Sequence, residues 1–270
     1  MTTKLVSAFK KIMISPSYLK VGVKFRIRNL LKYRKNINCI VSSPNNTRFY
    51  LGEDRIDEII LHHLFVDFRQ LYFPDNLKFN SNDLIIDVGS HHAIYLSELL
   101  TRNAGVNAIA IEPDENSIKY IKKNLFLNHL ENRVEIVNAA VSGKDGIGSL
   151  TRSDEGSWGN SISESFDDKD KTEKINLISL ETLVKNSRFK ELINSRQGNF
   201  KLLKINAEGG EFTILPLIFK AGIFPQFIIL MVHPEYGNWE ELRNLLLEND
   251  YEIKVANEHQ NRPAYHCWKN

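Results

Sequence analysis

The sequence predicts an α/β fold built on a mostly parallel β-sheet with helices packed against it. Short apolar segments alternate with amphipathic helical segments from residue 84 onward, a spacing typical of parallel βαβ units. A glycine-containing turn follows the first apolar segment. The chain has 270 residues, of which 42% are hydrophobic and 25% charged. This composition supplies a globular core and excludes a disordered chain.

Local patterns justify each element in chain order. Short continuous apolar runs predict buried strands, and apolar residues that recur every third or fourth position predict helices. The predicted strands are 84–88, 108–111, 134–137, 176–180, 202–207 and 227–232. The predicted helices are 54–72, 94–100, 115–127, 183–194, 212–221 and 239–248. Residues 251–255 and 264–268 predict a closing antiparallel pair, and the polar stretch 151–174 predicts a mobile loop.

The charge distribution divides the chain into a basic N-terminal extension, residues 1–82, and a main domain, residues 83–270. The first 52 residues hold 11 of the 35 basic residues and no acidic one, so the rest has a net charge of about −9. The extension is predicted to be mainly helical and amphipathic, although 19–27 also fits a strand. Three roles stay open for it: packing on the domain or a homodimer partner, contact with an anionic membrane surface, or nucleic-acid binding.

Composition also predicts the compartment. No apolar segment approaches the roughly 20 residues that a membrane helix needs. Lys10 and Lys11 fall inside what would be the apolar region of a secretory signal. The two cysteines, Cys39 and Cys267, form no CxxC motif, so neither a disulfide framework nor a zinc site is indicated. We therefore expect a cytoplasmic protein, with peripheral membrane contact as an option of its basic N-terminus.

The turn after the first strand is a candidate ligand site. Residues 87–93 join that strand to a helix, where a ligand can approach backbone amides and the helix N-terminus. The dinucleotide fingerprint G-x-G-x-x-G does not fit, because Asp87 occupies its first glycine position and would repel a pyrophosphate. A carboxylate there suits a ligand with a positive amino group. The alternative is that Asp87 only caps the helix.

The ends of the next two strands complete this site. Glu112, which ends the second strand before Pro113, can accept two hydrogen bonds from a ribose diol. Asn138 and Ala139 follow the third strand, where a small residue leaves room for an adenine and an amide can bind it. One acid for an amino group and one for a ribose, without a phosphate site, describe S-adenosylmethionine. The alternative for Glu112 is a solvated strand end.

Five motifs occur in a specific order: Ile85–His91, Ile111–Pro113, Asn138–Ser142, Ile178–Leu183 and Leu203–Glu211. This set resembles the FkbM family of class I S-adenosylmethionine-dependent methyltransferases over roughly residues 49–236. The resemblance implies a Rossmann-like, seven-stranded sheet with its last strand antiparallel, and methyl transfer to a hydroxyl of a sugar, glycan or small metabolite, with S-adenosylhomocysteine as product. The expected cofactor residues are Asp87, Gly89, Ser90, His91, Glu112, Pro113, Asn138 and Ala139.

Three positions depart from the family pattern. His91 and Ala93 stand where the family usually has Asn and Gly, and Asn206 stands where it usually has Asp. Histidine adopts a left-handed backbone more readily than most residues, which favours retention of the turn. The lost carboxylate at Asn206 counts against a metal there. These departures keep a second hypothesis open, a catalytically silent module that retains the fold for binding or scaffolding.

Three residues are candidates for the chemistry. His233 follows the fifth strand, and the usual histidine pKa of about 6.5 suits a general base; the alternative is a surface histidine in a turn. Glu208 follows the fourth strand as a base or substrate ligand, or as an acid favoured at a helix N-terminus. Lys204 is charged within an apolar strand, so we expect it to pair with a carboxylate of the site, such as Glu208 or Glu211, and to act electrostatically.

Metal and nucleic-acid chemistry are not expected. The adjacent histidine pairs 62–63 and 91–92 lack the spacing of a shared metal face, and we interpret them as structural. RNA methylation is disfavoured by the acidity of the chain after residue 52 and by the lack of an Asn-Pro-Pro-Tyr motif. The expected partner is a small-molecule or glycan acceptor.

Overall fold

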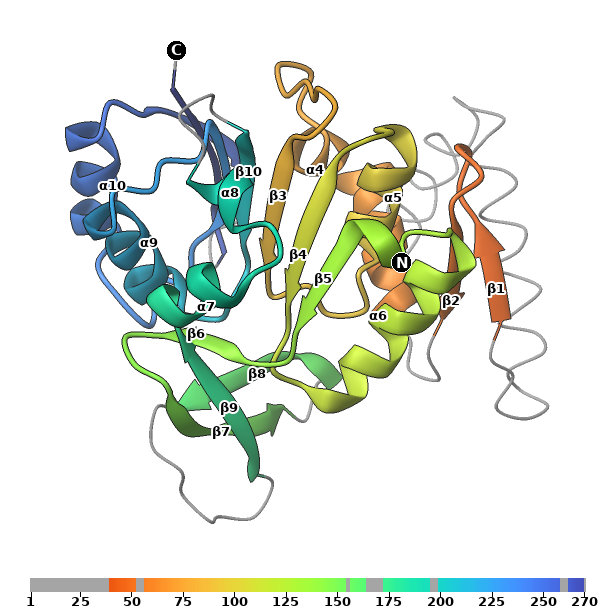
Figure 1. Ribbon diagram of the computed structural model, residues 1–270, viewed down its shortest axis with the longest axis horizontal. Helices are drawn as coiled ribbons and strands as arrows, with labels where there is room; N and C mark the ends of the chain where they lie inside the picture. Colours follow the sequence, from red (N-terminus) through yellow and green to blue (C-terminus); the bar gives the residue numbers. More distant parts are fainter. Residues whose placement is uncertain are drawn as a thin grey trace, which may run out of the picture.

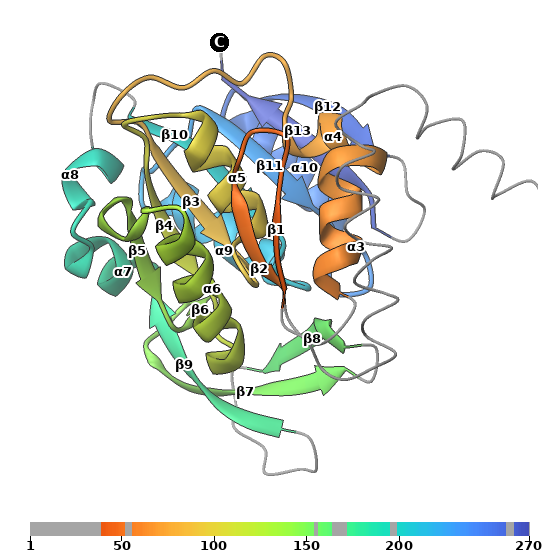
Figure 2. The ribbon, with the colours of Figure 1, turned by 90° about the vertical axis from the view of Figure 1, so that its right-hand side faces the viewer.

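A seven-stranded sheet forms the centre of the molecule, which is seen in a computed structural model describing residues 39–51, 56–153, 156–163, 172–194, 199–257 and 262–269. The strand order is β12-β13-β11-β10-β3-β4-β5, of which Figure 1 labels β10, β3, β4 and β5 and Figure 2 also labels β11, β12 and β13. The strands are β3 (Leu84–Val88), β4 (Asn107–Ile111), β5 (Val134–Val137), β10 (Phe200–Ile205), β11 (Phe227–Met231), β12 (Glu252–Asn257) and β13 (Ala264–Trp268). Strands β11 to β5 are parallel, and the last strand, β13, is antiparallel to both neighbours. This confirms the predicted Rossmann-like class I methyltransferase fold.

Helices cover both faces of this sheet (Figure 1). The helices are α5 (Ile94–Arg102), α6 (Glu115–Leu127), α7 (Leu180–Asn186), α8 (Lys190–Ile193), α9 (Glu211–Lys220) and α10 (Trp239–Glu248), and a 3-10 turn (Glu131–Arg133) precedes β5. Because strand side chains alternate, Ile85 joins the core under α5 and α6, whereas Ile86 joins the core under α9 and α10. No helix of the described residues is long and apolar enough to cross a membrane.

The described part of the N-terminal extension begins with an antiparallel hairpin, β1 (Cys39–Ser42) and β2 (Arg48–Leu51), that the sequence did not predict. The predicted helix 54–72 is divided into α3 (Ile56–His62), a π-helical turn (His63–Asp67) and α4 (Arg69–Tyr72). Phe49 and Leu64 share the core of Ile85. The division between residues 82 and 83 stays a prediction, and the amphipathic segments before residue 39 lie outside the described residues.

The polar stretch 151–174 was predicted as a loop, and its described parts are strands instead. A second sheet has the order β6-β9-β7-β8, with β6 (Ala140–Ser142), β7 (Gly146–Ser153), β8 (Gly156–Ser163) and β9 (Thr172–Ser179). Leu150, Ile175 and Leu177 alternate with polar residues and form a small core with Ala140. Because the stretch contains so many polar residues, the two-residue alternation typical of a half-buried strand was not recognised in the sequence. The sheet starts three residues after β5, so it lies at the carboxyl ends of the central strands, with β8 approaching α3 (Figure 2).

Candidate functional site

A cavity of about 770 Å³ lies at the carboxyl ends of β3, β4, β10 and β11. The second sheet, β6-β9-β7-β8, contributes Leu150 and Leu177 to its wall, and the α3–α4 region contributes Leu64 and Tyr72. The predicted residues that line it are Asp87, Gly89, Ser90, His91, Glu112, Pro113, Ala139, Lys204, Glu208 and His233. Asn138 does not line it, because its side-chain amide donates to the carbonyls of Glu112 and Pro113 and so holds the end of β4.

The turn after β3 keeps the left-handed backbone that the departures from the family pattern put in question. Gly89, His91 and Ala93 have φ values of 74°, 50° and 54°. A Cβ on Gly89 would lie 2.0 Å from the carbonyl oxygen of Asn206. Glycine is therefore required at this position because β10 approaches the turn closely. His91 and Ala93 adopt the same left-handed conformation, which costs a residue with a Cβ conformational free energy.

Lys204 pairs with a carboxylate of the site, as predicted, but the partner is Asp87 and not Glu208 or Glu211, which the sequence suggested. Its Nζ lies 2.6 Å from Asp87 Oδ1 and 3.2 Å from the carbonyl oxygen of Gly89. The parallel register of β10 and β3 places these two residues side by side. Burial raises the pKa of Asp87, and the Lys204 ammonium opposes this shift. Asp87 Oδ2 is buried without a hydrogen-bond partner among the described residues, so it remains available to a ligand on the cavity side.

Glu112 is held by backbone amides at the end of β4. Its Oε2 accepts from the His91 N–H at 2.8 Å, and its Oε1 accepts from the Asp114 N–H at 3.0 Å. Burial raises the pKa of Glu112 to about 7, although these two bonds oppose the shift. Each carboxylate oxygen keeps a lone pair. The carboxyl group is therefore fixed in orientation and can still accept from a ribose.

A cluster of charged side chains lies at the ends of β10 and β11. His233 Nδ1 is 2.9 Å from Glu211 Oε1, and its Nε2 is 3.4 Å from Glu208 Oε2. Glu208 Oε1 also accepts from Arg262 at 2.9 Å. Burial lowers the pKa of His233, but the two carboxylates outweigh it and raise the pKa to about 9. The carboxylates of Glu208 and Glu211 are thus both paired with the His233 imidazolium, and Glu208 is also paired with Arg262.

Sequence reasoning missed Tyr95 and Arg262. Tyr95 is the second residue of α5, lines the cavity and is only 5% exposed. Tyr95 lies among apolar residues of the predicted helix 94–100, so the local sequence gives no signal that it lines a cavity. Arg262 reaches Glu208 across 54 residues of sequence, and no local pattern carries such a contact.

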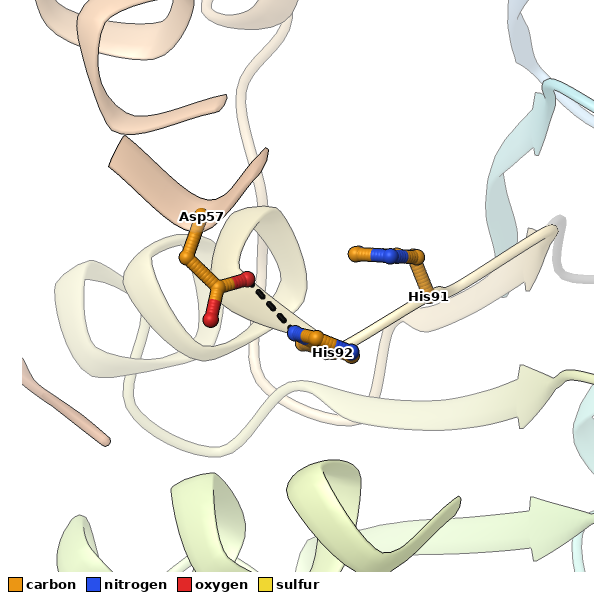
Figure 3. A group of neighbouring side chains, drawn as sticks. All are labelled: Asp57, His91 and His92. Carbon is orange, nitrogen blue, oxygen red and sulfur yellow. Dashed lines mark hydrogen bonds and ion pairs between the residues drawn. The ribbon is translucent and has the colours of Figure 1, made fainter. Parts of the chain in front are cut away.

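Two histidines of the turn form a cluster with Asp57 of α3. Figure 3 shows the Asp57 carboxylate beside the His92 ring, at 2.5 Å from Nδ1, and the His91 ring over His92. The two rings stack at 3.8 Å with an interplanar angle of 18°. The three residues offer atoms within 4.8 Å of one another. Imidazole lone pairs lie in the ring plane, however, so parallel rings do not direct them at one ion. We interpret the cluster as a connection between α3 and the turn.

Comparison with solved structures finds proteins of similar architecture at low identity. A methyltransferase FkbM from Methylobacillus flagellatus is 13% identical with a TM-score of 0.49, and the match covers 74% of this chain but 47% of that protein, about half its length. TrmK of M. capricolum, solved with S-adenosylhomocysteine, is 17% identical with a TM-score of 0.45, over 77% of this chain and 70% of that one. No curated protein is significantly similar in sequence.

A protein-family profile also matches the chain. The profile of the methyltransferase FkbM domain matches residues 87–253, which is more than half of the chain. The matched region starts at Asp87 and includes Glu112, Lys204, Glu208 and His233. The chain therefore belongs to the FkbM methyltransferase family.

Proposed function

We propose that this methyltransferase is an S-adenosylmethionine-dependent O-methyltransferase that acts on a hydroxyl of a sugar, a glycan or a small metabolite. One observation carries the proposal: a single cavity joins the carboxylates of Asp87 and Glu112 to the cluster of His233 and Glu208. Two strands, β3 and β10, lie between β4 and β11, so Glu112 and His233 stand about 14 Å apart across the sheet. This length leaves room for an elongated cofactor along the strand ends and for an acceptor between its sulfonium methyl and His233.

The residues present fit this cofactor. Asp87 Oδ2 is a buried acceptor without a partner among the described residues, as an amino group requires. Glu112 can accept the ribose hydroxyls, and Pro113 and Ala139 offer small apolar surfaces to an adenine. When bound, S-adenosylmethionine supplies an electrophilic methyl group on a sulfonium.

The chain's own contribution to the reaction is to position the hydroxyl and to take its proton. His233 lines the cavity. Its Nδ1 and backbone N–H are bound to Glu211, which leaves Nε2, 3.4 Å from Glu208 Oε2, as the ring nitrogen that can meet an acceptor. In its neutral form, His233 accepts the proton at Nε2. Glu211 is a positioning residue that fixes the ring and favours the imidazolium that results. Glu208, whose Oε2 lies 3.4 Å from Nε2, and Arg262, which pairs with Glu208 Oε1, orient the acceptor.

Calorimetric titration with S-adenosylmethionine and S-adenosylhomocysteine tests the cofactor site. We expect micromolar binding by the wild type and a loss of more than about 100-fold in an Asp87→Asn, Glu112→Gln double variant, because two hydrogen bonds to ionised groups are weakened. The isosteric changes keep a hydrogen-bonding partner for Lys204. An Asp75→Ala, Glu248→Ala variant, changed only at exposed acids, is the control and should bind normally. A folded wild type that binds neither ligand would favour the silent module.

Cofactor affinity should depend on pH through Glu112. Its pKa in the free protein is about 7, and ribose hydroxyls donate to the carboxylate, so binding favours the ionised form and lowers this pKa. Affinity should therefore rise, by up to about tenfold per unit, as the pH increases toward 7 and level off above it. Titrations at pH 6 in buffers of different ionisation enthalpy should show proton release. A Glu112→Gln variant should lose this release, and an unchanged release would contradict the role of Glu112.

A further inference from the structure

Tyr236 places a large aromatic ring at the edge of the cavity. It follows β11 by five residues, lines the cavity and is 52% exposed. Among the described residues, no other aromatic ring and no cation stacks on it. Aromatic rings are usually buried or used in binding, because their apolar faces are poorly hydrated. The exposed ring is therefore a candidate surface for the acceptor.

Gly209 provides the seat of this ring. It has a φ of 100°, and a Cβ built on it would lie 2.7 Å from Tyr236 Cγ. Any other residue would therefore strain the backbone and displace the ring. Packing against Gly209 covers the base of the ring, whereas about half of the Tyr236 residue stays exposed. The backbone after β10 thus sets the position of the ring.

Glu211 connects the seat of the ring to the candidate base. Its Oε2 accepts from the Gly209 N–H at 3.0 Å. Its Oε1 accepts from the His233 N–H at 2.7 Å and lies 2.9 Å from His233 Nδ1. The Tyr236 N–H, in turn, donates to the His233 carbonyl at 3.0 Å. Because one fully buried carboxylate holds both Gly209 and His233, the ring has a fixed place relative to the imidazole.

Exposure increases outward from the base toward this ring. The side chain of His233 is 1% exposed, that of Glu208 15% and that of Arg262 46%. All three line the cavity, and Gly209, the seat of the ring, directly follows Glu208. Arg262 gives one N–H to Glu208 Oε1, and its guanidinium has five, so donors remain for a ligand. The mouth of the cavity therefore presents an apolar ring beside groups that donate and accept.

A saturated sugar ring carries the complementary surfaces, because its C–H bonds form an apolar face and hydroxyls surround that face. We propose that Tyr236 determines acceptor specificity by stacking on the C–H face of a sugar, whose hydroxyls bond with Glu208 and Arg262. Another hydroxyl of the same sugar then meets His233 Nε2, and the rest of a glycoside extends into solvent. This inference rests on the proposed function and deepens it, because it selects a sugar among the acceptor classes and assigns its recognition to Tyr236.

A panel of alcohols that contain a ring tests the acceptor class. The probes are the methyl glycosides of glucose, galactose, mannose and rhamnose, together with cyclohexylmethanol and benzyl alcohol, which have a single hydroxyl. Formation of S-adenosylhomocysteine from S-adenosylmethionine measures methyl transfer to each probe. We expect at least one glycoside to exceed both simple alcohols in kcat/KM by about 10-fold or more, because only a glycoside can stack and also bond with Glu208 and Arg262.

Substitutions of Tyr236 test the stacking with the best glycoside. Tyr236→Phe keeps the ring, so KM should stay within about 3-fold of the wild-type value. Tyr236→Ala removes the ring and should raise KM by about 5- to 30-fold, with kcat changed by less than about 3-fold. Calorimetry should show unchanged affinity for S-adenosylmethionine in both variants. The matched control is Phe126→Ala, which removes a ring that is 66% exposed on α6 and lies outside the cavity.

The possible failures are distinguishable. Tyr236→Ala with an unchanged KM, or Tyr236→Phe as impaired as Tyr236→Ala, overturns stacking by the ring. A loss of cofactor affinity in Tyr236→Ala indicates a structural role and also overturns it. Equal or faster transfer to the simple alcohols overturns the choice of a sugar, as does transfer to no probe by a wild type that binds the cofactor. A folded wild type that does not bind S-adenosylmethionine overturns the proposed function itself.

Discussion

Replacing His233 with glutamine is expected to lower kcat for O-methyl transfer by about 10²- to 10⁴-fold, the range of a lost general base. Glutamine keeps polar contact with Glu211 but cannot accept a proton. Binding of S-adenosylmethionine should change little, because Asp87 and Glu112 lie on other strands. A His62→Gln variant, altered at an exposed histidine, is the control for the substitution. Single-turnover rates with a methylatable hydroxyl acceptor, together with calorimetry, measure both quantities.

The pH dependence of wild-type activity gives the sharper test of His233. Its pKa of about 9 means that it carries a proton at neutral pH, whereas a base must be neutral. The value of kcat/KM should therefore rise about tenfold per pH unit from pH 7 and level off near pH 9. A Glu211→Gln variant removes one of the two carboxylates that raise this pKa, so its plateau should begin about 1–3 units lower.

A flat profile between pH 6 and 9 would contradict this assignment. It would indicate a base that is ionised throughout, and Glu208 fits that description. Burial raises the pKa of Glu208, but its hydrogen bonds with His233 and Arg262 outweigh burial and hold the pKa below its usual range. The profile therefore separates the two sequence candidates for the base, which geometry alone leaves side by side at 3.4 Å.

The central sheet was predictable because its inner parallel strands are buried on both faces, whereas the edge strand β5 is partly buried. Strands buried on both faces are continuous apolar runs in the sequence, and the predicted bounds of β3 and β5 agree with the structure. Strand β7 and the first half of β9, before the predicted strand 176–180, were missed because one of their faces is polar and their alternation is short. The break between α7 and α8 was also missed. It falls at Ser187, whose side chain donates to Glu135, a contact 52 residues away in the sequence.

The candidate site, like the fold, could be predicted only in part. Residues at strand ends, such as Asp87 and Glu112, could be predicted because parallel strands bring their carboxyl ends to one edge. Which of the site's charged side chains pair with one another could not be predicted in the same way. The partner of Lys204 depends on the register of β10 against β3, which places it opposite Asp87. A shift of one or two residues would have changed its partner, and no local pattern fixes that register.

The close approach of Gly89, which follows β3, to Asn206, which follows β10, predicts a large effect on stability. Gly89→Ala is expected to lower the free energy of unfolding by about 2–4 kcal/mol, the sum of an overpacked contact and a left-handed backbone. The added Cβ would lie 2.0 Å from the backbone oxygen of Asn206, which no side-chain rotation can relieve. Separating β3 from β10 should also weaken the pair of Lys204 and Asp87, so cofactor affinity should fall together with stability.

Alanine substitutions at two further glycines separate the cost of the left-handed backbone from the cost of the overpacked contact. Gly222 has a φ of 72° with open space around it, so Gly222→Ala measures the backbone cost alone, about 1 kcal/mol. Gly143 has neither a positive φ nor a neighbour within 4 Å, so Gly143→Ala should be neutral or slightly stabilising. Chemical denaturation of the three variants gives the comparison. If Gly89→Ala costs no more than Gly222→Ala, the ends of β3 and β10 can separate without loss, and the rigid placement of Asp87 against Lys204 does not hold.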